Sequence, residues 1–313
     1  MATTTTGTTN FSSTVTADVK RRVLDNLRAK YAHGPMLGPI EGEYVEGTNS
    51  FTYVTYPDFA AATTALAEGT PPTASALSIS VDSFSATQLG ATVEISDLVA
   101  KQSKHNLVGI AAERLADNAA KTQDVLVREI LAAGASVFYG GTATSRATVA
   151  SSHILTGALV KRMVEELQFA NVEPYANGNY RAVISPRQAG DLQRDTANGG
   201  WVDIFKYNDN GVLEGLRTAS YAGVDFIVTA NSKVFTTAGA GSANVYAALF
   251  MGPNAFALND LQTLSAYLVG FGGDHSDPIA QKAIAGWKLT FGAKLLTGPG
   301  ARLMRLETGA TYG

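Results

Sequence analysis

The sequence of 313 residues contains no cysteine. Disulfides, thiolate metal sites and cysteine nucleophiles are therefore excluded. Charged residues make up only 16% of the chain, compared with about 25% in a typical soluble domain. A surface so poor in charge is either solvated by Thr, Ser and Asn or buried against partners. The second alternative favours an obligate assembly.

The sequence also lacks the marks of a membrane or secreted protein. No run approaches the roughly 18 apolar residues of a membrane-spanning helix. The first sixteen residues, MATTTTGTTNFSSTVT, lack the basic and then apolar plan of a secretory signal. We therefore expect a polar N-terminal arm, a soluble protein made in the cytoplasm, and no membrane partner. The net charge of −3 gives no reason to expect nucleic-acid wrapping by bulk electrostatics.

Basic residues are missing from a long window of the chain. Between Tyr31 and Ala100 there is no lysine or arginine, whereas eight carboxylates give the window a charge of −8: Glu41, Glu43, Glu46, Asp58, Glu68, Asp82, Glu94 and Asp97. Residues 1–30, in contrast, carry +3, with a basic cluster at Lys20, Arg21 and Arg22. Such segregation favours docking of one segment on an oppositely charged surface. The alternative is a solvated acidic face.

The first third of the chain predicts an arm and a projecting hairpin. Apolar residues in 14–32 fall near helical spacing and predict a short amphipathic helix. Strands are expected at 51–56 and at 87–96, where apolar and polar residues alternate. The long connection between them contains Pro71-Pro72, which forbids helix. Because such connections are rare inside compact domains, we expect these two strands to form a hairpin that projects from the body.

A long helix follows at residues 106–133, with a stripe of apolar residues at spacings of three and four, and Gly134 at its end. Twenty-eight residues span about 42 Å, which is typical of a strut across a large body.

The remainder predicts an α+β lobe. Thr156 is expected to cap a helix, and Ser185-Pro186 to cap and open another after a strand at 179–185. Further strands are expected at 223–229 and 244–251. Near the C-terminus, residues 285–296 alternate as a strand, and 301–307 is expected to be its hairpin partner.

One short stretch, GGDHSDPIAQK, gathers residues that could carry chemistry. It places His275 between Asp274 and Asp277. A structural loop, in which Asp277-Pro278 turns the chain from one lobe into the other, is the favoured interpretation, because neighbouring side chains on an extended loop point apart. The alternatives are a ligand cluster and, more distantly, a soluble hydrolase that uses His275 and Asp277. No nucleophile elbow or phosphate-binding loop occurs, so we expect neither an enzyme nor a cofactor.

The order of the elements resembles a known family. The stretches that carry the resemblance are ATTALAEGTPPTASALSIS (62–80), TVEISDLV (92–99), AAERLADNAAKTQDVLVREILAAG (111–134), NYRAVISPRQAGDLQRD (179–195) and DPIAQKAIAGWKLTFGAKLL (277–296). Together they resemble the major capsid protein of tailed double-stranded DNA phages, with the Hong-Kong-97-like fold, and within it a subfamily of short-tailed phages. The resemblance implies an α+β fold divided into an N-terminal arm, an extended β-hairpin loop, a spine helix with the first part of a peripheral domain, an axial domain and a return to the peripheral domain, at residues 1–41, 42–100, 101–155, 156–260 and 261–313.

The resemblance further implies hexamers and pentamers in an icosahedral head that encloses double-stranded DNA, contacted non-specifically. The protein would be assembled in the host cytoplasm and would reside in the virion. Its partners would be copies of itself, a separate scaffolding protein, a portal and a decoration protein. An encapsulin-type compartment shell is the alternative. The candidate inter-subunit contacts are Glu41, Glu43, Glu46, Glu68, Pro71, Pro72, Lys20, Arg21, Arg22, Asp274, His275 and Asp277.

Overall fold

The structure is a computed structural model, and it describes residues 32–312 with gaps. The gaps are residues 57–58, 64, 66–68, 70–73, 104–106, 135, 198–219, 273–276, 278 and 297–301. The predicted helix at 14–32 therefore lies outside the described residues. So do several of the candidate contacts: Lys20, Arg21, Arg22, Glu68, Pro71, Pro72, Asp274 and His275.

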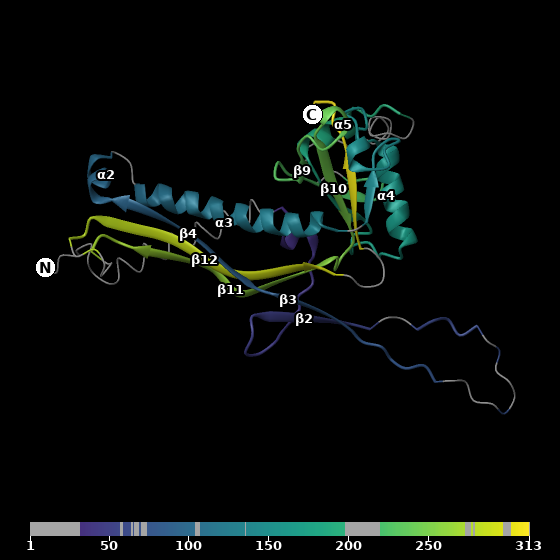
Figure 1. Cartoon of the computed structure of the whole chain (residues 1–313), viewed down its shortest axis with the longest axis horizontal. Helices are drawn as coiled ribbons and strands as arrows, with labels where there is room; N and C mark the ends of the chain where they lie inside the picture. The colour runs from purple at the N-terminus through teal and green to yellow at the C-terminus, as the bar shows by residue number, and fades with distance from the viewer. Residues whose placement is uncertain are drawn as a thin grey trace.

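The first lobe consists of a long helix packed on a long sheet. Helix α3, Leu107–Ala132, lies across a three-stranded antiparallel sheet in the order β11-β12-β4 (Figure 1). The strands are β4 (Thr87–Ser96), β11 (Phe256–Val269) and β12 (Lys282–Leu295), and the short helix α2 (Asp97–Gln102) follows β4. The helix predicted at 106–133 is confirmed.

The core between this helix and this sheet follows the alternation of β12. Trp287, Leu289 and Phe291 are buried in one apolar cluster with residues of α3 such as Leu115 and Leu131. The indole nitrogen of Trp287 also donates a hydrogen bond to the side-chain oxygen of Asn118 on α3, at 3.1 Å. Because the side chains of a strand alternate between its faces, the even-numbered residues of β12 face away from α3.

The second lobe is built on a mixed seven-stranded sheet, in the order β5-β13-β10-β6-β8-β7, with β9 also paired to β10. Its strands are β5 (Val137–Tyr139), β6 (Tyr180–Ile184), β7 (Ser220–Tyr221), β8 (Val224–Val228), β9 (Val234–Phe235), β10 (Val245–Met251) and β13 (Leu303–Thr308). Helices α4 (Gly157–Phe169) and α5 (Pro186–Gln193) belong to this lobe, with short 3-10 turns at Arg146–Thr148 and Ala240–Ser242. Every residue of β10 is buried, as expected for a central strand.

Local capping sets where the two helices of this lobe begin. The Thr156 hydroxyl accepts from the backbone nitrogen of Leu159, and the Ser185 hydroxyl accepts from that of Gln188. Gln188 reaches back to the Ser185 backbone nitrogen and completes a capping box. Both caps were predicted from the sequence, and both are confirmed.

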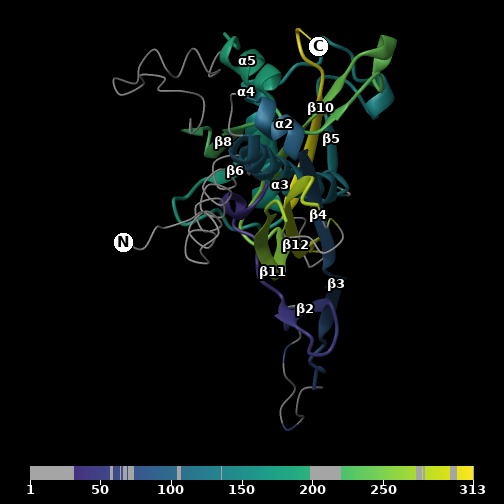
Figure 2. The same ribbon diagram turned by 90° about the vertical axis from the view of Figure 1, so that its left-hand side faces the viewer.

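A smaller sheet projects from the body. Strands β1 (Glu43–Tyr44), β2 (Ser50–Thr55) and β3 (Ser80–Ser85) pair in that order. Beyond them the described residues between β2 and β3 extend away from the body in both views (Figures 1 and 2). We call β2, β3 and the described residues between them the projecting hairpin.

Two expectations about strand partners were wrong. The partner of β2 is β3, because β4 pairs with β12 along its whole length. The strand predicted at 301–307 is β13, and it pairs with β10 and β5 rather than with β12. The true hairpin partner of β12 is β11, which the sequence did not reveal, since bulges between Asp260 and Ser265 interrupt its alternation.

A third expectation, about the turn at Asp277, was also wrong. This turn joins β11 to β12, which are neighbours in one sheet. It therefore does not carry the chain from one lobe to the other.

Candidate inter-subunit surfaces

The projecting hairpin exposes large apolar side chains. Leu77, Ile79 and Val81 are 59%, 59% and 58% exposed, and Tyr56 on the outgoing strand is 60% exposed. Val81 lies in β3, and Leu77 and Ile79 directly precede that strand. We call these three residues the apolar stripe, because alternate residues of an extended segment share one face. Monomeric proteins rarely leave contiguous apolar surface of this kind to water.

Specific polar contacts hold the base of the hairpin to the body. The Lys294 ammonium of β12 lies 2.8 Å from the Asp82 carboxylate and donates to the carbonyl of Ser83. The Asn259 side chain of β11 accepts from the Gly42 nitrogen at 2.7 Å and donates to the Gly42 carbonyl at 2.9 Å. The hairpin is thus held at a defined exit point while its apolar stripe stays uncovered.

Several acidic residues in the window from 31 to 100, which lacks lysine and arginine, form ion pairs within the chain. Asp82 pairs with Lys294, Glu94 lies 3.8 Å from Lys282, and Asp97 pairs with Lys101 at 3.0 Å. These three are therefore neutralised within their own chain. The charge left for a neighbour is smaller than the sequence indicated.

Three candidate contacts stay free at the elbow where the hairpin leaves the body. Glu41, Glu43 and Glu46 are exposed and form no ion pair with the part of the chain that the structure describes. Desolvation, and then the charge of Glu41, raise the pKa of Asp260 on the adjacent strand β11. Among the described residues, the elbow therefore carries negative charge that no ion pair neutralises.

A buried polar network fixes the chain just before the elbow. His33 and Asp124 are both fully buried, and the His33 Nδ1 lies 2.9 Å from Asp124 Oδ1. The same carboxylate accepts from the backbone nitrogens of Ala32 and His33, and its other oxygen accepts from Asn231. Burial alone would raise the pKa of Asp124, but these bonds and the imidazole lower it. We call this the His33–Asp124 latch, and neither residue was singled out as functional from the sequence.

Asp277 has a structural use. It is 9% exposed, and its Oδ2 accepts from the backbone nitrogen of Lys282 at 2.8 Å, which closes the turn before β12. Within the described ranges no three His, Cys, Asp or Glu residues gather as a metal site. Asp277 is therefore positioned as a turn residue, while Asp274 and His275 lie outside the described residues.

Comparison with known proteins decides the family. The sequence matches the family described as phage capsid protein over residues 80–301, which is most of the chain. The chain belongs to the phage capsid protein family. Membership of this family gives the chain a structural role in the phage head. This capsid protein is located in the virion. No curated protein matches the sequence.

Solved capsid structures share the fold of this capsid protein. The Cyanophage Pam1 capsid is 16% identical, with a TM-score of 0.66 over 85% of this chain and 86% of that one. The capsid of Ralstonia phage GP4 is 17% identical, with a TM-score of 0.64 over 85% and 84%. A virus-like particle from Pyrococcus furiosus is 12% identical, with a TM-score of 0.53 over 93% and 98%. The predicted Hong-Kong-97-like α+β fold is confirmed.

Among the described helices, none has the length and apolar character needed to cross a membrane.

Proposed function

We propose that this capsid protein assembles into hexamers and pentamers of an icosahedral head that encloses double-stranded DNA. The observation that carries the proposal is the projecting hairpin, whose apolar stripe no part of the described chain covers. A hairpin of this kind is marginal in water by itself. Its exposed side chains would be stabilised by burial against another copy.

The size of this effect supports assembly. Full burial of one large aliphatic side chain contributes about 1.5–3 kcal/mol. Three such residues contribute on the order of 5 kcal/mol for each contact, before the cost of association. A closed shell repeats the contact many times, so modest pairwise energies are sufficient.

The proposal includes the domain division and the partners expected from the resemblance. Residues 42–100 would act as the extended loop, 156–260 as the axial domain, and 261–313 as the return to the peripheral domain. A separate scaffolding protein, a portal and a decoration protein would complete a head assembled in the host cytoplasm. The DNA would be contacted without sequence preference. Because residues 31–100 contain no lysine, the loop cannot donate an amine to a covalent crosslink.

A cellular compartment shell is the second candidate. The likeness to the Pyrococcus furiosus particle, over 93% of this chain, favours it. The two candidates differ in what they enclose, and the content of purified particles separates them.

The test is electron microscopy of the purified full chain. The protein is imaged alone and after mixing with lysate of the source host. We expect capsomers or closed shells. Nuclease-protected DNA inside the shells supports the phage head, and protein cargo without nucleic acid supports the compartment. A stable monomer under both conditions would contradict the proposal.

A further inference from the structure

The second lobe gathers cations around one aromatic ring. Phe235 lies on β9, and the cationic groups of Arg146, Lys233 and Arg305 lie 3.5, 5.4 and 5.8 Å from the centroid of its ring. A cation over an aromatic face is attracted to the ring, but the ring carries no net charge that could neutralise three cations. We call Arg146, Lys233, Arg305 and Phe235 the cation cluster.

Two carboxylates contact the cation cluster. Glu307 is fully buried, and its two oxygens accept from the Arg146 side chain at 2.9 and 2.6 Å. Glu129 pairs with Lys233 and also, at 2.6 Å, with Arg128 of α3. Within these contacts four cations face two carboxylates, so an excess charge of +2 remains.

Arg305 is the cation of this cluster with the weakest compensation. It is 8% exposed, and its Nε lies 2.9 Å from Glu307 Oε1 without the geometry of a hydrogen bond, so no described group accepts from this nitrogen. Burial lowers the pKa of the Arg305 guanidinium by more than Glu307 raises it. A buried cation that lacks its hydrogen bonds destabilises the fold. Local costs of this kind are expected where a residue binds a ligand.

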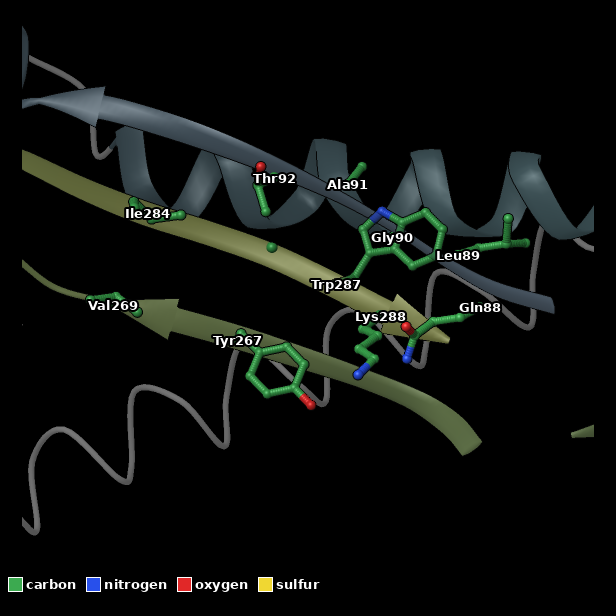
Figure 3. Close-up of a pocket in the computed structure, with 11 residues that line it drawn as sticks. Gln88, Leu89, Gly90, Ala91, Thr92, Tyr267, Val269, Ile284, Trp287 and Lys288 are labelled. Carbon is green, nitrogen blue, oxygen red and sulfur yellow. The ribbon is translucent and has the colours of Figure 1, made fainter. Parts of the chain in front are cut away.

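A hollow on the first lobe has a different chemistry. A groove of about 460 Å³ on the β11-β12-β4 sheet is lined mostly by uncharged residues, among them Tyr267, Val269 and Trp287 (Figure 3). Among the described residues that line it, Lys288 is the only cation. The cation cluster, rather than this groove, therefore has the charge to attract an anion.

We propose that the cation cluster binds a phosphate group through Arg305, Arg146 and Lys233. Phosphate oxygens match the planar fork of a guanidinium and accept charge-assisted hydrogen bonds. The Arg146 and Lys233 side chains are 35% and 23% exposed, so solvent reaches the cluster beside the buried Arg305.

Two sources supply such a group: the backbone of packaged DNA and free inorganic phosphate. The first source rests on the proposed function, and the second does not.

The substitution Arg305→Met tests the site, because it removes the cation with the weakest compensation and leaves the Arg146–Glu307 pair in place. Calorimetric titration of the unassembled full chain with inorganic phosphate, at constant ionic strength, measures binding. We expect the variant to bind roughly tenfold more weakly or less, as for the loss of a hydrogen bond between charged groups.

Thermal unfolding without phosphate is the second measurement on Arg305→Met. We expect this variant to unfold at the same temperature as the unsubstituted chain or higher, because an apolar side chain replaces a buried cation. An Arg305 that only supports the fold would give the opposite pattern: a lower unfolding temperature and unchanged phosphate binding. That pattern would overturn the proposal.

Lys233→Gln is the second variant and serves if Arg305→Met does not fold, since Glu129 keeps its pair with Arg128. It should also weaken phosphate binding. The matched control is Arg162→Gln. Arg162 likewise lies over a ring, 5.6 Å from the Phe138 centroid, but its side chain is 52% exposed and lies 3.9 Å from Glu166. The control should bind phosphate as the unsubstituted chain does.

A short DNA duplex and an acidic peptide, each added in competition with phosphate, identify the source. Displacement of phosphate by the duplex, weakened in the same variants, supports DNA; phosphate binding that the duplex does not displace supports free phosphate. A peptide that binds more tightly than either, and is lost in the same variants, would overturn the proposal in favour of a protein partner. Equal phosphate binding by all variants, or none by the unsubstituted chain, would also overturn it. Particle formation is measured separately, so each of these failures leaves the capsid role standing.

Discussion

Asp124 accepts four hydrogen bonds from two distant parts of the chain: the segment at Ala32 and His33, and the loop at Asn231. It lies on the spine helix α3, so the latch ties the beginning of the described chain and the seven-stranded lobe to one helix. A buried carboxylate that accepts from this many donors stabilises the folded protein chiefly because its loss would leave those donors without acceptors.

The substitution Asp124→Ala is expected to lower the free energy of unfolding by about 3–5 kcal/mol, since each buried donor left unpaired costs about 1–3 kcal/mol. Urea unfolding of the unassembled subunit measures it. The control Asp117→Ala, on the same helix in a surface pair with Arg114, should change stability by less than about 1 kcal/mol. Equal effects of the two substitutions would contradict the importance of the latch.

The latch also predicts a pH dependence. The pKa of Asp124 is lower in the folded protein than its ordinary value of 3.8. Its contribution is therefore complete above about pH 4 and is lost as the pH falls through the folded value. The stability difference between the unsubstituted chain and Asp124→Asn should shrink in that acid range. A difference that stays constant from pH 7 to pH 2.5 would show that the carboxylate charge is unimportant.

The elbow carboxylates give the third residue-scale prediction. Reversing Glu41, Glu43 and Glu46 to lysine should impair assembly at low salt, because these exposed charges form no ion pair with the part of the chain that the structure describes. The matched control replaces the same residues by glutamine, which removes the attraction without adding repulsion and should impair assembly less. Light scattering across a salt series measures both. Normal shells from the lysine variant at low and high salt would refute the electrostatic contact.

At the scale of elements, caps decide where the helices of the second lobe begin. Gln188 is fully buried, and beyond the capping box with Ser185 it donates to the Tyr246 carbonyl and the Thr308 hydroxyl. Helix α5 is therefore fixed to β10 and β13 by the same residue that completes its cap.

Ser185→Ala should lower stability by about 1 kcal/mol or more, because it removes an N-cap acceptor and releases Gln188 from one of its partners. Thermal unfolding of the subunit measures the effect. Ser152→Ala, at an exposed loop position, is the matched control and should be neutral. A neutral Ser185→Ala would mean that packing alone positions α5.

At the scale of the whole molecule, the chain consists of two lobes and a projecting hairpin. Apolar side chains far from the two cores are only partly buried by the rest of the chain. Exposed apolar residues gather on the hairpin and also near α2, where Leu98 and Val99 are 59% and 52% exposed. A chain with these surfaces and only 16% charged residues is expected to complete its burial in an assembly. Electron microscopy of the particles tests this expectation for the whole assembly.

Elements whose signals are local could be predicted from the sequence. Helix α3, the caps at Thr156 and Ser185, and the alternation of β12 all follow from residues within a few positions of one another, and the order of these elements sufficed to identify the fold. The folded chain alone shows which strands are partners, because any two strands form the same kind of backbone hydrogen bonds and their register depends on segments far apart in the sequence. It alone brought His33 to Asp124, 91 positions away. It also showed that Asp82 and Glu94 form ion pairs, since the lysines of β12 that neutralise them lie some two hundred residues further along the chain.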